Sequence, residues 1–206
     1  MDIYEPEFFD PESTPYGQTY GYWTIRWWRW FLSTPKLTNP VLDQTGKYAH
    51  IHQPSEHVWF LAGKIANENG NLPHRFCSLP AGKSVLFPVI NFEANPLEYR
   101  ELKTDQDLIE RVQIEEDSII RKECSVNGKS IPPQRIKSDP LIFKLRLDEN
   151  NALSIKGGET TFASADGYWI FLKSLAIGDY TVSFEGSCQY GKVRSGANYL
   201  LQVREE

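Results

Sequence analysis

The sequence predicts a mainly β protein: a single jelly-roll-like β-sandwich with a tryptophan-rich N-terminal helix and one further helix. Many short β-prone segments separated by turn residues fill its second half, which is typical of sandwiches and jelly rolls. Aromatic residues are frequent, with 6 Trp, 10 Tyr and 11 Phe, and such residues favour strands. With 206 residues and no low-complexity linker, the chain suits one domain over residues 1–206.

The N-terminal region predicts an arm followed by a buried helix. Residues 1–20 are acidic and aromatic, and we expect an arm that packs on the domain or stays partly loose. Residues 22–33 predict a helix ended by Pro35. Its polar stripe is narrow and consists of Arg26, Arg29 and Ser33. A helix that is apolar around most of its circumference is normally buried, so we expect Trp27 and Trp30 to be buried.

A second helix is predicted over residues 104–122, because Thr104 and Asp107 form a capping box and apolar residues recur at helical spacing after them. Asn127-Gly128 between β-prone runs predicts a hairpin. The other expected strands are 48–53, 57–65, 83–91, 141–147, 152–156, 167–174, 179–186 and 197–204.

Charge and cysteine content exclude several classes of protein. The net charge of −5 and the lack of a Lys/Arg-rich block argue against nucleic-acid binding. No apolar run approaches the roughly 18 residues that a membrane helix needs, and the N-terminus does not resemble a secretory signal. Cys77, Cys124 and Cys188 lack zinc-site spacing. We therefore expect a cytoplasmic protein with three reduced thiols.

One segment resembles a metal site. His50 and His52 lie two positions apart, so on a strand their imidazoles would point the same way. Glu56, in the next turn, would add an oxygen ligand. Imidazole and carboxylate together suit Fe, Mn, Ni or Zn, so these residues are a candidate site for a divalent transition metal. The alternative is a polar strand at a surface or a pocket mouth.

A second candidate site follows an apolar run. Asn91 and Glu93 lie two residues apart after residues 85–90, and polar groups on one face at the end of a buried strand are placed to line a pocket. Strand-end solvation is the alternative. Trp59, with its polar N–H, is a candidate for stacking a flat ligand, although such residues more often fill the space between sheets.

An ordered string of motifs resembles a group of uncharacterised bacterial β-rich proteins. The motifs lie at residues 23–30, 39–46, 58–63, 80–93 and 165–169 and cover most of the chain. The resemblance implies a shared fold and no established activity. Many members of that group look exported and carry a cysteine near position 49–50 placed to pair with one at 77. Here the region reads Tyr48-Ala49-His50, so that pairing is absent.

A shorter resemblance is to the cupins, which are double-sheet jelly rolls. His50, His52, Glu56 and Gly63 match the spacing of the first cupin metal motif, and Pro80-Ala-Gly82 is similar to part of the second. The second motif's histidine would fall near Val85, and the chain has none there. The match is therefore partial and lacks the third imidazole.

These observations favour a sandwich protein that binds a small ligand or a protein partner, since the sequence offers no complete catalytic set. The first alternative is a metal-dependent cupin-like enzyme that uses His50, His52 and a carboxylate. The second is a structural or assembly subunit, in which an aromatic arm over residues 4–22 docks on a neighbour. Self-association into a homo-oligomer is part of this alternative.

Overall fold

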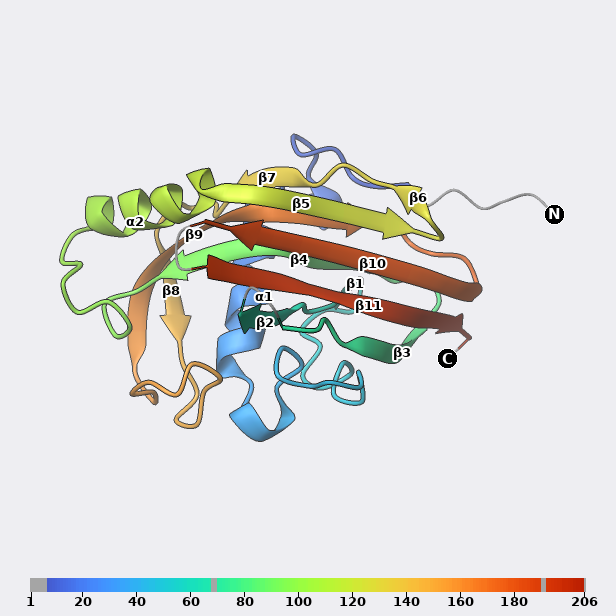
Figure 1. The fold of residues 1–206 in the computed structure, drawn as a ribbon, viewed down its shortest axis with the longest axis horizontal. Coiled ribbons are helices and arrows are strands. Elements are labelled where there is room, and N and C mark those ends of the chain that lie inside the picture. Colours follow the sequence, from blue (N-terminus) through green and yellow to red (C-terminus); the bar gives the residue numbers. More distant parts are fainter. Residues whose placement is uncertain (1–6, 68–69, 190–191, 206) are drawn as a thin grey trace.

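Two sheets and two α-helices form the protein, which confirms the mainly β sandwich with a helix near the N-terminus (Figure 1). The computed structural model describes residues 7–67, 70–189 and 192–205. Helix α1 (Tyr20–Ser33) lies close to its predicted range, and α2 (Asp105–Asp117) is five residues shorter at its end than predicted. Short 3₁₀ turns occur at Pro15–Gly17 and Lys36–Thr38.

The first sheet, here called sheet A, has the order β1-β4-β9-β7, with β8 also paired to β9. Its strands are β1 (Val58–Phe60), β4 (Ser84–Ala94), β7 (Gln134–Lys137), β8 (Phe143–Arg146) and β9 (Thr160–Leu172). Strands β4 and β9 are antiparallel over most of their length, whereas β1 and β4 are parallel.

The second sheet, sheet B, has the order β2-β11-β10-β5-β6, with β3 also paired to β11. Its strands are β2 (Lys64–Asn67), β3 (His74–Pro80), β5 (Ile119–Val126), β6 (Lys129–Ser130), β10 (Gly178–Cys188) and β11 (Val193–Arg204). The pair β3–β11 is parallel. A purely antiparallel jelly roll has no parallel pairs, so the jelly-roll connectivity stays a prediction.

Sheet A is buried on both faces, because α1 covers one face and sheet B covers the other (Figure 1). Its side chains alternate accordingly: Leu86 packs in the cluster with α1, and Val85 and Phe87 pack in the cluster with sheet B. A strand buried on both faces reads as a continuous apolar run. Burial of β4 on both faces therefore explains why residues 85–90 form an uninterrupted apolar run.

The predicted buried helix is confirmed. Trp27 and Trp30 are each 3% exposed. Thr19 begins the helix by accepting a hydrogen bond from the Tyr22 backbone N–H, as an N-cap residue does. In the described part of the N-terminal arm, Phe9 packs on Phe171 of β9 with ring centroids 4.8 Å apart. Residues 1–6 lie outside the described range.

The hairpin and the capping box are also confirmed. Asn127 and Gly128 both have positive φ, as a two-residue type I′ turn requires, and they join β5 to β6. Thr104 and Asp107 exchange the two reciprocal hydrogen bonds of a capping box. The helix nevertheless ends at Asp117, because Ile119 and the residues after it pair with β10.

Other sequence-based strands were wrong or missed. Residues 48–53 form turns and residues 152–156 form no strand. Strands β3 and β7 were not predicted, and β1 and β2 are separate strands where a single strand over 57–65 was predicted. Within the described part of the chain, none of the helices combines the length and apolar character needed to cross a membrane.

Candidate functional site

A cavity of about 190 Å³ opens at one end of the sandwich, where β4 ends and β11 begins. We call it the end cavity. Side chains from α1, β2, β4, α2, β11 and two loops line it. Its apolar wall consists of Trp28, Phe31, Ile65, Ile90, Phe92, Leu153 and Val193. Its polar groups belong to Asn91, Glu93, Glu98, Tyr99, Glu115 and Ser195.

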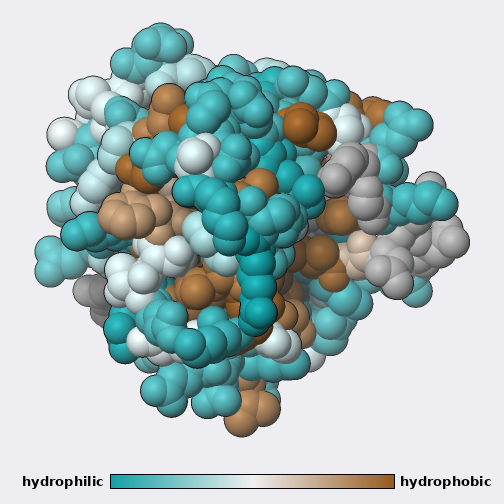
Figure 2. Space-filling view, turned by 90° about the vertical axis from the view of Figure 1, so that its left-hand side faces the viewer, coloured by the Kyte–Doolittle hydropathy of each residue, from teal (hydrophilic) through white to brown (hydrophobic). Residues whose placement is uncertain are grey.

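The end of the molecule near α2 and β8 carries apolar surface in recesses between hydrophilic residues (Figure 2). Helix α2 and the adjoining ends of β10 and β11 lie at this end of the molecule (Figure 1). The residues that line the end cavity come from both sheets and both α-helices, so the cavity lies where these elements meet.

A β-bulge directs the last part of β4 toward this cavity. The pairing register of β4 with β9 shifts between Pro88 and Ile90, and Pro88 has no N–H to donate to the ladder. Two glycines allow close packing beyond the bulge. A Cβ on Gly167 would lie 2.5 Å from the Asn91 Cβ, and a Cβ on Gly186 would lie 2.4 Å from the Ile90 Cβ. Both glycines are therefore needed for this packing.

Glu93 is a carboxyl group buried in the cavity wall, 6% exposed. The Asn95 Nδ2 donates to both of its carboxyl oxygens, at 3.1 and 3.3 Å. The Asn95 Oδ1 in turn accepts from the backbone N–H groups of Leu97 and Glu98, which fixes the loop after β4. Burial, together with the negative charges of Glu98 and Glu115, raises the pKa of Glu93 to about 8, although the hydrogen bond from Asn95 opposes the shift.

Helix α2 supplies the second buried carboxyl group. The Arg111 Nε and Nη2 donate to Glu115 Oε1 at 3.0 and 2.8 Å, and the guanidinium lies 4.3 Å from the centre of the Tyr99 ring. Burial raises the pKa of Glu115 although Arg111 opposes the effect, and burial also raises the pKa of Glu98. The Arg111 guanidinium thus acts on Glu98 and Glu115, and no such interaction is present at Glu93.

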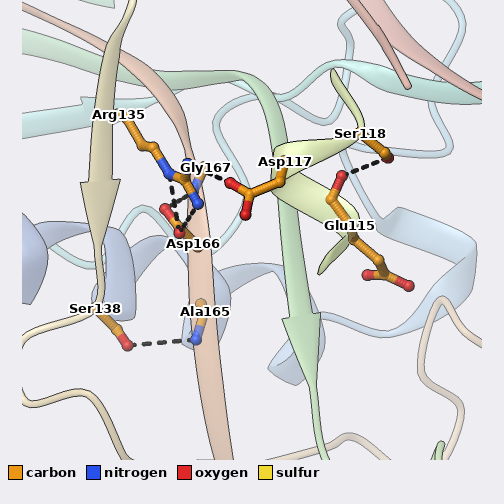
Figure 3. Close-up of polar contacts among 8 residues, drawn as sticks. All are labelled: Glu115, Asp117, Ser118, Arg135, Ser138, Ala165, Asp166 and Gly167. Atoms are coloured by element: carbon orange, nitrogen blue, oxygen red, sulfur yellow. Dashed lines mark hydrogen bonds and ion pairs between the residues drawn. The ribbon is translucent and has the colours of Figure 1, made fainter. Parts of the chain in front are cut away.

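An ion-pair network fixes the end of α2 against sheet A (Figure 3). Arg135 of β7 donates to Asp166 Oδ2 of β9 through Nε at 3.1 Å and Nη2 at 2.8 Å, and through Nη1 to Asp117 at 2.6 Å. Asp166 is 1% exposed. Figure 3 shows the Glu115 side chain pointing away from this network. The network therefore positions the helix that brings Glu115 to the end cavity.

The structure brings Asn91 and Glu93 to one cavity, as their spacing predicted, and places Trp59 elsewhere. Trp59 is 8% exposed and belongs to the core between the two sheets. Because the other members of that core are tightly buried apolar side chains, its ring fills space there. It does not line the end cavity.

His50 and His52 do not lie on a strand, so the geometric argument for two convergent imidazoles was wrong. Both are exposed and lie in consecutive turns, and His52 has φ of 50°. Glu56 is exposed at the bend before β1. In the described ranges, no three His, Cys, Asp or Glu side chains are grouped so that they could hold a metal ion.

Glu115 was not predicted as a site residue, although its position in the apolar pattern of α2 indicates a buried carboxyl group. Leu108, Val112, Glu115 and Glu116 lie at i, i+4, i+7 and i+8 on the buried stripe of α2. Acidic residues at apolar positions of a helix indicate buried carboxyl groups. Glu98 and Tyr99 follow β4 in a loop and carry no comparable signal. Trp28 was assigned only to a buried helix.

Comparison of the chain with protein-family models, with curated proteins and with solved structures finds no match. The case for the site therefore depends on its own geometry.

Proposed function

We propose that this protein binds a small organic ligand, about the size of one ring with one or two substituents, in the end cavity. The observation that carries the proposal is a buried carboxyl group, Glu93, set in an apolar-walled cavity of about 190 Å³. A cavity of about 150 Å³ is large enough for benzene, so this one accommodates a substituted ring.

The placement of Glu93 supports a binding role because it costs folding free energy. Burial of a carboxyl group with incomplete hydrogen bonding is unfavourable. Among the described residues, only the Asn95 amide donates hydrogen bonds to the Glu93 carboxyl oxygens. A titratable group with a strongly shifted pKa in a cavity is a typical feature of functional sites. An apolar pocket with a few convergent polar groups is typical of ligand binding.

The other functions remain less supported. A metal-dependent cupin-like enzyme would need the His50 and His52 imidazoles to converge, and their turns give no such arrangement. The aromatic arm predicted for assembly spans residues 4–22; residues 4–6 lie outside the described range, and Phe9 in its described part packs on Phe171 of the same chain. The resemblance to the bacterial β-rich group and the cytoplasmic location stay predictions.

The proposal is tested with three probes of the same shape: benzyl alcohol, benzylammonium and benzoate. We expect at least one to bind, observed as chemical-shift changes of Ile90 and Val193 in methyl-labelled protein. Leu153→Trp fills the cavity from its rim and should abolish these changes. Leu37→Trp is the matched control, because Leu37 is 88% exposed and does not line the cavity.

Two results would contradict the proposal. One is the absence of shift changes with all three probes at millimolar concentration. The other is equal binding to the wild type and to Leu153→Trp, provided that the variant melts cooperatively.

A further inference from the structure

The end cavity carries more negative than positive groups. Glu93, Glu98 and Glu115 line it, and no lysine or arginine belongs to the described residues that do so. The one guanidinium bonded to this set, that of Arg111, donates two hydrogen bonds to Glu115 and lies over Tyr99. The positive charge of Arg111 also acts on Glu98, whereas no cation among the described residues is bonded to Glu93.

Aromatic rings form a large part of the wall. Trp28, Phe31, Phe92 and Tyr99 all line the cavity. The face of an aromatic ring attracts a cation through its quadrupole, most strongly where water is excluded. Arg111 over Tyr99 is an example of this contact at the cavity itself. Carboxylates and aromatic rings together recognise an organic cation through both its charge and its apolar body.

Three buried tryptophans, Trp28, Trp59 and Trp169, have an Nε1 without a hydrogen-bond partner among the described residues, and Trp28 is the one of these three that lines the end cavity. Trp28 is 6% exposed. Most buried indole N–H groups find an acceptor. Trp23, Trp27 and Trp30 of the same helix each donate to a backbone carbonyl. The exception among these four is the one at the cavity.

We propose that the end cavity selects a small organic ammonium ion with an apolar or aromatic body. This inference rests on the proposed function and adds the class of ligand. The ammonium group would lie against Glu93 and Glu98, and the body would contact the aromatic wall. An anion would be repelled by Glu98 and Glu115, and a neutral ligand would gain no counter-ion from Glu93.

Binding of such a cation is coupled to a proton. In the free protein Glu93 holds a proton near neutral pH, because burial and the charges of Glu98 and Glu115 oppose its ionisation. Arg111 and Tyr99, which also face this group of carboxyls, do not offset that effect. When an ammonium ion binds, Glu93 releases its proton to solvent and becomes its counter-ion. Affinity for the cation should therefore rise between about pH 6 and pH 8.

Isothermal titration calorimetry of the full chain with benzylammonium, benzyl alcohol and benzoate tests the inference. We expect benzylammonium to bind at least about tenfold more tightly than benzyl alcohol, since a charge-assisted hydrogen bond contributes about 1.5–3 kcal/mol. Titration in buffers of different ionisation enthalpy should show proton release with benzylammonium alone.

Glu93→Gln keeps the shape of the side chain and resembles the protonated form, so it should fold. We expect it to lower benzylammonium affinity at least about tenfold and to leave benzyl alcohol affinity unchanged. Glu101→Gln is the matched control, because Glu101 is exposed in the same loop region and does not line the cavity. It should change neither affinity.

The outcomes separate the two proposals. Equal binding of benzyl alcohol and benzylammonium in the cavity would overturn the proposed preference for a cation, whereas the proposal of a ligand site would hold. Preference for benzoate, or competition by Mg²⁺ or Zn²⁺ that depends on Glu93, would also overturn the proposed selectivity for an organic ammonium ion. Failure of all three probes to bind would overturn both proposals.

Discussion

Neighbouring tryptophans on helix α1 lie in two different environments. Trp27 faces the core between α1 and sheet A, where its Nε1 donates to the Leu61 carbonyl oxygen at 2.8 Å. Trp28 faces the end cavity, where its Nε1 has no partner among the described residues. The core around Trp27 consists of apolar and aromatic side chains, although its Trp169 Nε1 also has no partner among the described residues, whereas the cavity region adds the buried carboxyl groups of Glu93 and Glu115. The first arrangement stabilises the fold, and the second is suited to a ligand.

The largest effect is expected from the core side of this comparison. Trp27→Ala should lower the free energy of unfolding by about 3–5 kcal/mol, because it leaves a large void beside Trp169 and Phe31. Urea denaturation followed by circular dichroism measures the change. Leu37→Ala, at an exposed position, should change it by less than about 0.5 kcal/mol. A loss below about 1 kcal/mol for Trp27→Ala would show that this core is not close-packed.

The network that positions α2 should give the next largest effect. Arg135→Met leaves Asp166, which is 1% exposed, without its counter-charge. We expect a loss of about 2–3 kcal/mol, below the full value for a buried pair because the Arg135 side chain is 32% exposed. The double variant Arg135→Met/Asp166→Asn should recover part of this loss. If it is no more stable than Arg135→Met, the pair does not act as described.

Buried carboxyl groups should make stability depend on pH. Glu116 of α2 is 2% exposed, neither of its carboxyl oxygens has a hydrogen-bond partner in the described residues, and burial raises its pKa to about 9. Its pKa in the unfolded chain is about 4. The folded state thus binds this proton more tightly, so stability is greatest below the unfolded pKa and falls as pH rises to about 9.

Glu116→Gln removes that dependence. Its advantage over the wild type should be near zero at about pH 4 and reach at least about 2 kcal/mol at about pH 9, measured by denaturation at each pH. Glu110→Gln, at an exposed position of the same helix, should show no such trend. An advantage that does not change with pH would mean that Glu116 ionises normally in the folded protein.

The smallest expected change in stability tests the comparison of Trp27 with Trp28 most directly. Trp27→Phe leaves the Leu61 carbonyl oxygen without its donor and should cost about 1–3 kcal/mol, whereas Trp28→Phe removes an N–H that bonds to nothing described and should cost below about 1 kcal/mol. The paired denaturation curves give the difference directly. Equal costs would show that the Trp28 N–H has a partner of equal strength.

Local sequence signals predicted the fold better than they predicted the site. The apolar circumference of α1, the Thr104 capping box and the Asn127-Gly128 turn are encoded by neighbouring residues, and all are confirmed. The strand at 48–53 was wrong because the segment instead forms turns, held in part by the Trp30 Nε1 bond to the Ile51 carbonyl oxygen. That contact joins residues far apart in sequence.

The site depends on such distant contacts almost entirely. Asn91 and Glu93 line the cavity together with Ile90 and Phe92, so the whole end of β4 and not one of its faces contributes to the wall. The partners of Glu93 come from elsewhere: Glu98 from a loop and Glu115 from a helix whose position depends on Arg135. No local pattern joins these residues. Only the tertiary structure does.

The central claim is that Glu93 is a buried carboxyl group at a ligand cavity, and its titration tests this most directly. The carboxyl ¹³C signal of Glu93, assigned with Glu93→Gln, can be followed against pH with and without benzylammonium. We predict a midpoint at about pH 8 in the free protein and a lower midpoint when the cation is bound. The claim would be contradicted by a midpoint at about pH 4, the ordinary value for a glutamate, that benzylammonium does not change.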